Sequence, residues 1–169
     1  MTSKELDTLI LEFLNGNKEK FDDIYYATEK NVYLSIFSIF KDYDIVKDLM
    51  QDTYIKALDQ LDKYKVGTNF SAWIAKIARN IAINEYNRRK KVDYYEDITS
   101  PVFMEEDNNS KLKQMLDVVD DEYKDVVIYH IILGFKFREI SEILDIPQST
   151  VFVMYKNAIK QIKRRYDYE

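Results

Sequence analysis

The chain of 169 residues is 46% apolar, enough for a hydrophobic core, yet it contains only three glycines and two prolines. A sheet protein needs many turns, so this scarcity predicts an all-α protein with long helices. The absence of cysteine excludes disulfides and thiolate metal sites. No apolar run approaches the roughly 20 residues of a membrane span, and no secretion-type leader is evident. We therefore expect a soluble, cytoplasmic protein.

The net charge of −5 is unevenly distributed along the chain. Residues 71–91 carry six basic residues and one acidic residue, and residues 156–169 carry five and two. Residues 92–110 carry six acidic residues and no basic one. Because phosphate binding depends on local charge within about 10 Å, the two basic stretches are compatible with nucleic-acid binding. Basic residues at helix C-termini also complement the helix dipole in many proteins, which leaves a second interpretation open.

Apolar spacing divides the first half of the chain into helices, which we expect at about 3–15, 18–41, 44–63 and 70–91. Asn15-Gly16-Asn17 separates the first two, and Val66 to Asn69 form the loop before the last. Asp44 is the expected N-cap of the third helix.

The second half begins with an acidic segment that lacks helical periodicity. It contains Pro101 and the acids Asp93, Glu96, Asp97, Glu105, Glu106 and Asp107. Such a segment predicts a linker. Beyond it we expect helices at about 111–118, 121–133, 136–144 and 147–166. The sequence thus predicts two small helical domains, at 1–92 and 111–169, joined by an acidic linker at 93–110.

The helix expected at 44–63 combines a core face with an acidic face. The core face holds Val46, Met50, Tyr54, Ala57 and Leu61. The opposite face holds Asp48, Gln51, Asp52, Ile55, Asp59 and Asp62, with the aliphatic residues Ile45 and Leu49 at its shoulder. Apolar residues rimmed by charge suit a protein interface, whereas single exposed aliphatics are also common on ordinary surfaces. The residues alone leave both interpretations open.

An enzyme is not expected. Asp48 and Asp52 lie one helical turn apart, but no histidine or third acid joins them at metal-ligand spacing. The sole histidine, His130, lies in an apolar stretch and is expected to be packed or hydrogen-bonded. No glycine-rich phosphate loop or nucleophile motif is present, so we expect no metal and no cofactor.

The helix expected at 70–91 has a second face rich in amides and amines. Phe70, Ile74, Ile77, Ala78 and Ile81 form its core face, and the other face holds Trp73, Lys76, Asn80, Asn84, Asn87 and Lys91. Asparagine can hydrogen-bond base edges, lysine contacts phosphates, and aromatic rings stack on unpaired bases. The alternative is a packed Trp73 with solvated asparagines.

The last two helices have the layout of a helix-turn-helix. Asp145 occupies the tight turn, where a positive φ is needed, and Pro147 suits the first turn of the following helix. The inward face of the second helix holds Val151, Tyr155, Ala158 and Ile162. The outward face, which would enter a major groove, holds Ser149, Val153, Lys156, Asn157 and Lys160. An ordinary αα-hairpin is the alternative.

Taken together, these motifs resemble the extracytoplasmic-function (ECF) group of bacterial RNA polymerase sigma factors, which have regions 2 and 4 only. The resemblance rests on Asp48-Leu49-Met50-Gln51-Asp52-Thr53-Tyr54, Phe70-Ser71-Ala72-Trp73, Ile77-Ala78-Arg79-Asn80 and the basic run Arg88 to Lys91. These four motifs occur in the same order as in region 2 of the family. The helix-turn-helix comes after a linker, as region 4 does in the family.

The resemblance implies binding to core RNA polymerase and to promoter DNA. The acidic helix would dock on the coiled coil of the largest subunit through Asp48, Leu49, Gln51, Asp52 and Ile55. The next loop and helix would capture flipped-out bases of the −10 non-template strand through Tyr64, Asn69, Phe70, Trp73, Lys76, Arg79, Asn80, Asn84, Arg88 and Arg89. Base flipping costs a few kcal/mol of lost stacking, which this site would have to offset.

The resemblance further implies that region 4 binds the −35 element and the flap of the second-largest subunit. The −35 contacts would come from Gln148, Ser149, Thr150, Val153, Lys156, Asn157 and Lys160. The chain departs from the family at Phe152, Met154 and Asn157, where basic residues are common, so we give Phe152 and Met154 no base-specific role. An anti-sigma factor is a further partner that the resemblance allows. Two other hypotheses are a polymerase-independent helix-turn-helix regulator and a sigma-like decoy.

Overall fold

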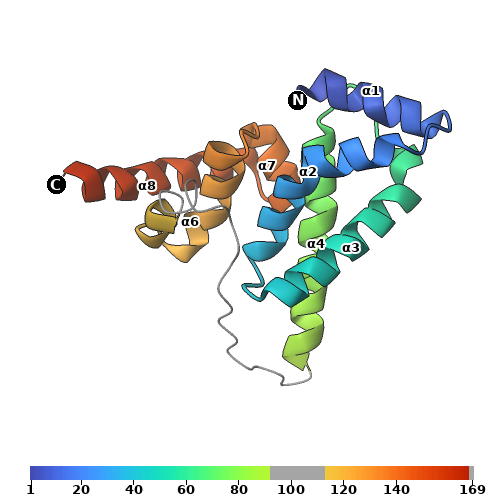
Figure 1. Ribbon diagram of the computed structural model, residues 1–169. Helices are drawn as coiled ribbons and strands as arrows, with labels where there is room; N and C mark the ends of the chain where they lie inside the picture. Colours follow the sequence, from blue (N-terminus) through green and yellow to red (C-terminus); the bar gives the residue numbers. More distant parts are fainter. Residues whose placement is uncertain (92–112, 168–169) are drawn as a thin grey trace. The chain divides into compact units, whose positions relative to one another are not determined.

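A computed structural model describes residues 1–91 and 113–167 (Figure 1). The chain divides into two compact units, residues 1–100 and 101–169. Every regular element in the described residues is helical, which confirms the all-α prediction. The acidic linker predicted at 93–110 and the start of the helix predicted at 111–118 lie outside the described residues.

The first unit contains α1 (Ser3–Leu14), α2 (Lys20–Phe37), α3 (Tyr43–Asp59), the short 3-10 helix η1 (Leu61–Lys63) and α4 (Phe70–Lys91). A capping box begins α1: the Thr2 hydroxyl accepts from the Glu5 N–H, and the Glu5 carboxylate accepts from the Thr2 N–H. The chain then turns toward α2 at Gly16, whose φ of 105° suits a residue without Cβ.

The start of α3 differs from the prediction. Asp42, not Asp44, is the N-cap, because its Oδ1 accepts hydrogen bonds from the N–H groups of Asp44 at 2.9 Å and Ile45 at 3.1 Å. The preceding helix correspondingly ends at Phe37 rather than at 41, which leaves a short connection before the cap.

One core unites the helices of this unit. Helix α2 packs along both α3 and α4, and α1 packs against α2 (Figure 1). The predicted core residues Val46, Tyr54, Ala57 and Leu61 are buried in it, and Met50 is half-buried against it. From α4, it includes Phe70, Ile74, Ile77, Ala78 and Ala82.

The second unit begins with helical residues 113–117, followed by α6 (Asp121–Val126), the π-helical η2 (Val127–Ile132), α7 (Phe137–Leu144) and α8 (Gln148–Asp167). The single helix predicted at 121–133 is continuous but changes winding at Val127. A widened-turn bond of 3.0 Å joins the Leu133 N–H to the Ile128 carbonyl. Gly134, with φ 71°, follows this stretch.

The turn between α7 and α8 confirms the helix-turn-helix layout. Asp145 adopts φ 54° and ψ 47°, the left-handed conformation that the sequence predicts. The Ser141 hydroxyl donates to the Ile146 carbonyl, and the Pro147 carbonyl accepts from Thr150 and Val151 at the start of α8. Val151 and Ala158 face inward and are buried, as predicted.

Candidate functional site

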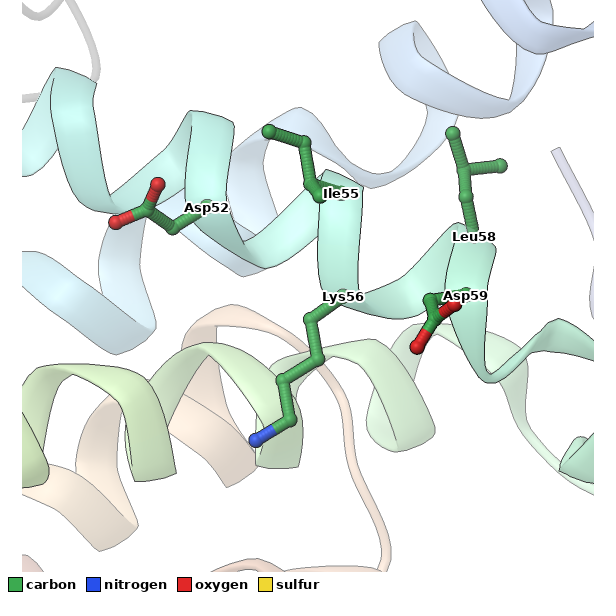
Figure 2. Close-up of a pocket in the computed structure, with 5 residues that line it drawn as sticks. All are labelled: Asp52, Ile55, Lys56, Leu58 and Asp59. Atoms are coloured by element: carbon green, nitrogen blue, oxygen red, sulfur yellow. The ribbon is translucent and has the colours of Figure 1, made fainter.

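The outer face of α3 exposes apolar side chains among charged ones. Ile55 is 61% exposed and Leu58 is 40% exposed, although both are aliphatic. Figure 2 shows them on the same side of α3 in a shallow pocket with Asp52, Lys56 and Asp59. Asp48 and Gln51, one turn earlier, are also exposed. This arrangement offers apolar contact surrounded by charges that can orient a partner.

The prediction that Leu49, at the shoulder of this face, is exposed for polymerase binding is wrong. Its side chain is 6% exposed and is part of the core of the unit. Because α3 packs against both α2 and α4, its buried arc is wider than the predicted stripe. Leu58, in contrast, was missed, although its position three residues after Ile55 places it on the same side of the helix.

An aromatic cluster lies where η1 leads into α4. The rings of Tyr64 and Phe70 meet edge to face at 5.0 Å, and Trp73 lies 5.3 Å from Phe70 and 5.5 Å from Tyr64. Tyr64 is 6% exposed and Phe70 3%, while Trp73 is half-buried. The prediction that Tyr64 and Phe70 contact bases is therefore corrected: buried rings support the surface, and only Trp73 of the three offers part of its ring to it.

The loop before α4 is held by polar contacts that the sequence analysis did not identify. Asp7 of α1 is only 8% exposed, and its carboxylate accepts hydrogen bonds from the Tyr64 hydroxyl and the Gly67 N–H. Burial and the bond to Asp7 raise the pKa of Tyr64 well above its ordinary value, so the hydroxyl keeps its proton. The signal for Asp7 was available: it lies between two positions of the buried face of α1, Leu6 and Ile10.

Asn69 begins α4. Its Oδ1 accepts from the Ala72 N–H at 3.3 Å, and its carbonyl accepts from the Trp73 N–H at 3.0 Å. The side chain therefore caps the helix, which restricts the role in base contact that the sequence predicts.

Beyond Trp73, the structure brings the predicted polar stripe of α4 together on an exposed surface. Lys76, Asn80 and Asn84 are exposed, as are Asn87 and Lys91. Arg79, predicted with them, is half-buried. The stripe offers amides and amines along one helix to a single strand or to phosphates.

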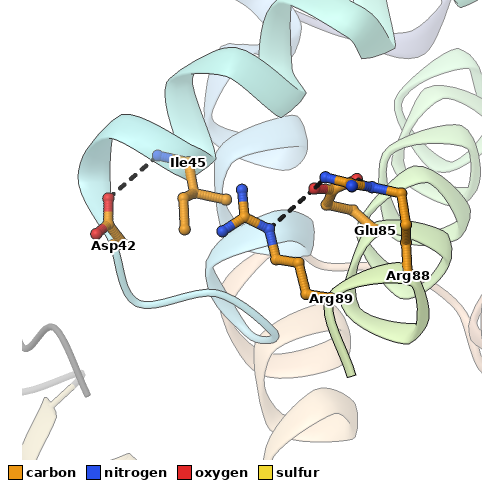
Figure 3. A network of polar contacts seen from close by, with 5 residues as sticks. All are labelled: Asp42, Ile45, Glu85, Arg88 and Arg89. Carbon is orange, nitrogen blue, oxygen red and sulfur yellow. Dashed lines mark hydrogen bonds and ion pairs between the residues drawn. The ribbon is translucent and has the colours of Figure 1, made fainter. Parts of the chain in front are cut away.

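The basic end of α4 is partly neutralised from within the helix. Figure 3 shows Glu85 between two arginines: its carboxylate accepts from Arg88 at 2.6 and 2.9 Å and from Arg89 at 2.9 Å. These contacts, above all that from Arg88, lower the pKa of Glu85. Arg89 also lies 5.7 Å from the centre of the Phe40 ring. Both arginines, predicted to bind the −10 DNA, thus donate to a carboxylate with which a DNA contact would compete.

The outer face of α8 carries most of the residues predicted for the major groove. Exposed on it are Gln148, Ser149, Thr150, Val153, Lys156 and Lys160, together with Phe152. The Lys156 ammonium lies 5.5 Å from the centre of the Phe152 ring. The prediction that Asn157 contacts the −35 DNA is corrected. Asn157 is half-buried, and its side-chain amide lies 3.4 Å from the Tyr123 hydroxyl.

Other predicted features have structural roles or are not found in the described residues. The Nδ1 of His130 lies 2.8 Å from the Phe135 carbonyl, and its ring packs against Phe137 and Tyr155. Within residues 1–91 and 113–167, no group of three or more metal-ligating side chains gathers. No helix in those ranges is long and apolar enough to cross a membrane.

Comparison with known protein families explains why these surfaces occur in one chain. The model of sigma-70 region 2 matches residues 14–92, and the model of sigma-70 region 4 matches residues 110–162. The chain belongs to the ECF group of RNA polymerase sigma factors. Residues 14–92 include the α3 face and the α4 stripe, and residues 110–162 include the helix-turn-helix.

Individual proteins show the same relationship. This sigma factor is 26% identical over 162 residues to the ECF RNA polymerase sigma factor SigW of Bacillus subtilis (strain 168), covering 84% of this chain and 86% of that protein. It is 24% identical over 136 residues to the sigma factor CarQ of Myxococcus xanthus, covering 76% and 78% of the two chains.

Two solved structures share the fold at lower identity. CnrH, in complex with the cytosolic domain of CnrY, gives a TM-score of 0.67 at 18% identity, covering 96% of this chain and 97% of CnrH. The sigma factor RpoE from Bartonella quintana, in complex with the anti-sigma factor NepR, gives 0.67 at 20% identity, covering 86% and 96%.

As a sigma factor, the protein binds core RNA polymerase and promoter DNA and directs transcription initiation. Membership in the family does not favour a polymerase-independent regulator or a decoy.

Proposed function

We propose that this sigma factor divides its work among three surfaces: the outer face of α3 binds core polymerase, the α4 stripe captures the −10 strand, and the outer face of α8 contacts the −35 element. The observation that carries the proposal is the exposed Ile55 and Leu58 among charged residues on α3. Opening a promoter in this way needs binding and strand capture rather than covalent catalysis. We infer that it acts in the cytoplasm, without a metal or a cofactor.

We assign the polymerase contact to the predicted residues Asp48, Gln51, Asp52 and Ile55, and we add Leu58 from the structure. The carboxylates would steer a basic surface, for which we propose the coiled coil of the largest subunit. The aliphatic side chains would supply affinity once the interface excludes water. Leu49 acts only from the core, by holding α3 in place.

For strand capture, Lys76, Asn80 and Asn84 are the direct contacts that we propose, with the exposed part of Trp73 as a stacking surface. Tyr64 and Phe70 support Trp73 from the core side. Arg88 and Arg89 would contact phosphates in competition with Glu85. Arg79, half-buried, is assigned a position beside the stripe rather than a base contact.

For the upstream element, the proposed contacts are Gln148, Ser149, Thr150, Val153, Lys156 and Lys160. The same unit would contact the flap of the second-largest subunit, which would hold it near the DNA. Few basic side chains line this face, so we expect weak duplex binding by the free protein and stronger binding within the holoenzyme.

An anti-sigma factor is a further partner that we propose. The two solved structures described above are complexes, and the partner of RpoE is the anti-sigma factor NepR. A protein that covers the Ile55 face of α3 would block polymerase binding directly. Its addition should displace the sigma factor from core polymerase in gel filtration.

The first test is transcription by purified bacterial core polymerase from AT-rich genomic fragments, with and without this chain. Start sites that appear only with the protein support the proposal and identify its promoters. If the chain co-elutes with its cognate core polymerase but gives no initiation, strand capture by α4 is contradicted. If it does not co-elute, the assignment of the α3 face is contradicted as well.

Surface variants separate polymerase binding from DNA opening. Ile55→Asp should weaken core binding about tenfold or more. The matched control is Leu11→Asp, an exposed aliphatic residue of α1 in the same unit, which should leave core binding unchanged.

The triple variant Lys76→Gln, Asn80→Ala, Asn84→Ala tests strand capture. It should retain core binding but lose the permanganate reactivity of unpaired promoter thymines. Lys30→Gln, an exposed lysine of α2, is its control. Normal opening by the triple variant would show that the α4 stripe does not capture the strand.

A further inference from the structure

The carboxylate of Asp7 joins helix α1 to a loop that is distant in the sequence. Its Oδ1 accepts from the Tyr64 hydroxyl at 2.7 Å, and its Oδ2 accepts from the Gly67 N–H at 3.0 Å. Both oxygens are therefore committed to the segment between η1 and α4. Hydrogen bonds to an ionised carboxylate are stronger than those between neutral groups, so α1 holds this segment in place.

The loop itself is closed by further contacts. The Thr68 hydroxyl and N–H both donate to the Lys65 carbonyl, at 2.7 and 3.3 Å, and the Tyr64 hydroxyl also lies 3.1 Å from the Thr68 carbonyl. Gly67 has φ +93°, which side-chain-bearing residues rarely adopt. With Asn69 capping α4, the backbone from Tyr64 to Asn69 has one well-defined path.

What this path presents to solvent is a short set of side chains next to the proposed strand-capturing surface. Lys65, Val66 and Thr68 are exposed, and Val66 is 42% exposed although it is apolar. Trp73 and Lys76 follow on the first turns of α4. An exposed apolar side chain and a partly exposed indole can each contact the face of an unpaired base.

A role in stability alone is a poor explanation for a buried carboxylate. Removing a carboxylate from water is costly, and an apolar residue often serves a core as well or better. The loop ends are already fixed by Tyr64 and Phe70, which are buried in the core. What Asp7 adds is the position of Gly67, at the tip of the loop. Asp7 also lies outside residues 14–92, where the region 2 model matches.

We propose that Asp7 is a positioning residue for capture of the −10 strand. Its carboxylate fixes the loop from Lys65 to Asn69, so that the exposed loop side chains meet unpaired bases in one geometry. The inference rests on the proposed function of this loop and of α4. Without the anchor the loop samples several geometries, and the ability to distinguish the correct base falls more than activity as a whole.

The test is a ratio measured with the holoenzyme. Transcription is compared on a promoter mapped as described above and on the same promoter with one −10 base replaced. A partly unfolded protein lowers both rates by the same factor, so the ratio does not respond to stability. We expect Asp7→Ala to lower this discrimination about tenfold, the order expected for a lost hydrogen bond to a charged group. Lys65→Gln should lower activity on both promoters while retaining the loop path.

The chain offers a matched pair of tyrosines as a control. Tyr64 and Tyr54 are both 6% exposed, and the Tyr54 hydroxyl lies 2.8 Å from the Thr28 hydroxyl in the same core. Each change to phenylalanine removes one buried hydroxyl. Tyr64→Phe should lower the ratio about two- to threefold. Tyr54→Phe should leave the ratio unchanged, even if it lowers the melting temperature as much as Tyr64→Phe does.

The outcomes separate the two levels of the proposal. If Asp7→Ala does not fold, the ratios measured for Asp7→Asn and Tyr64→Phe test the positioning role instead. An unchanged ratio in these variants, with a lowered melting temperature, would overturn the positioning role and leave the proposed function intact. If the wild-type holoenzyme itself shows no −10 discrimination at any base, the proposed function fails, and the role of Asp7 with it.

Discussion

The two units of this sigma factor solve the problem of presenting a DNA-binding surface in different ways. The first unit buries polar side chains that link distant segments: Asp7 holds the loop before α4, and Thr28 joins α2 to Tyr54 of α3. In the second unit, among its described residues, the buried side chains are aliphatic or aromatic, and the buried hydroxyl of Tyr129 is the polar group among them. Of the polar links of its α8, the one between Gln161 and Asp120 is exposed and the one between Asn157 and Tyr123 is only part-buried. A single-stranded base needs a shaped site, whereas a duplex groove can be entered by one exposed helix.

The difference extends to the sizes of the cores. The core of the first unit draws on every helix from α1 to α4, and its partly buried rim includes many aromatic rings. Helix α8 buries only Val151 and Ala158. Most of the other buried residues of the second unit come from α6, η2 and α7, and among the described residues the first unit buries more apolar side chains in all. We therefore expect the first unit to be the more stable one.

The largest expected effect comes from truncating one buried isoleucine in each unit. Ile74 is 1% exposed and Ile140 is 0% exposed, so Ile74→Ala and Ile140→Ala should each cost about 2–5 kcal/mol. Trp73 is the only tryptophan and lies in the first unit. Urea unfolding followed by its fluorescence should shift for Ile74→Ala alone, whereas far-UV circular dichroism should shift for both. A fluorescence shift with Ile140→Ala would contradict the expectation that the two units unfold independently of each other.

The second largest effect concerns the turn of the helix-turn-helix. Asp145 is left-handed, with φ 54°, so Asp145→Val should destabilise the second unit by about 1–2 kcal/mol. Asp145→Gly should be neutral or slightly stabilising, because glycine adopts this conformation without strain. Circular dichroism melts of the full chain measure both. Equal losses for the two variants would point to the carboxylate rather than to the backbone.

A smaller effect separates duplex contact from strand capture. Lys156→Gln should lower the slope of log affinity against log salt by about 1 for holoenzyme on a fragment with only the upstream element. Lys76→Gln should leave that slope unchanged but reduce opening of a complete promoter. Fluorescence anisotropy gives the slope. Identical effects of the two lysines would abolish the distinction between the surfaces.

The smallest expected effect is a gain. Glu85→Gln removes the carboxylate that engages Arg88 and Arg89, so single-strand binding by the holoenzyme should increase about two- to fivefold, with a steeper salt dependence. Because the pKa of Glu85 is lowered from 4.5, its ion pairs stabilise the fold above that pH and are lost as the pH falls below it. Acidification from pH 8 to pH 6 should therefore not reproduce the gain. Weaker binding by Glu85→Gln would show that Glu85 orients the arginines for DNA.

The sequence was sufficient to predict the helices, the turn at Asp145 and the exposed stripe of Lys76, Asn80 and Asn84. These depend on periodicity and local backbone preference, which a single helix determines largely by itself. It did not show that Leu49 and Tyr64 are buried. A helical wheel gives the direction of a face, but the width of the buried arc depends on how many neighbouring helices pack against it.

The sequence also did not show which polar side chains already have a partner within the protein. Asn69 caps a helix, Asn157 contacts Tyr123, and Arg88 and Arg89 both donate to Glu85. A sequence pattern counts each of these as available to DNA, because it shows the chemical group and not the partner that already occupies it. Asp7 is the converse case, in which a residue outside the recognised motifs holds the loop that precedes α4.

The π-helical stretch from Val127 to Ile132 has a consequence for comparing this protein with its relatives. A π turn accommodates one residue more than an α turn while the helix continues through it. A relative lacking one residue here could rewind the stretch as ordinary α-helix and keep α7 and α8 unaltered. A one-residue gap in this segment of an alignment would then record a change in winding, and it should not be taken as the loss of a promoter-binding element.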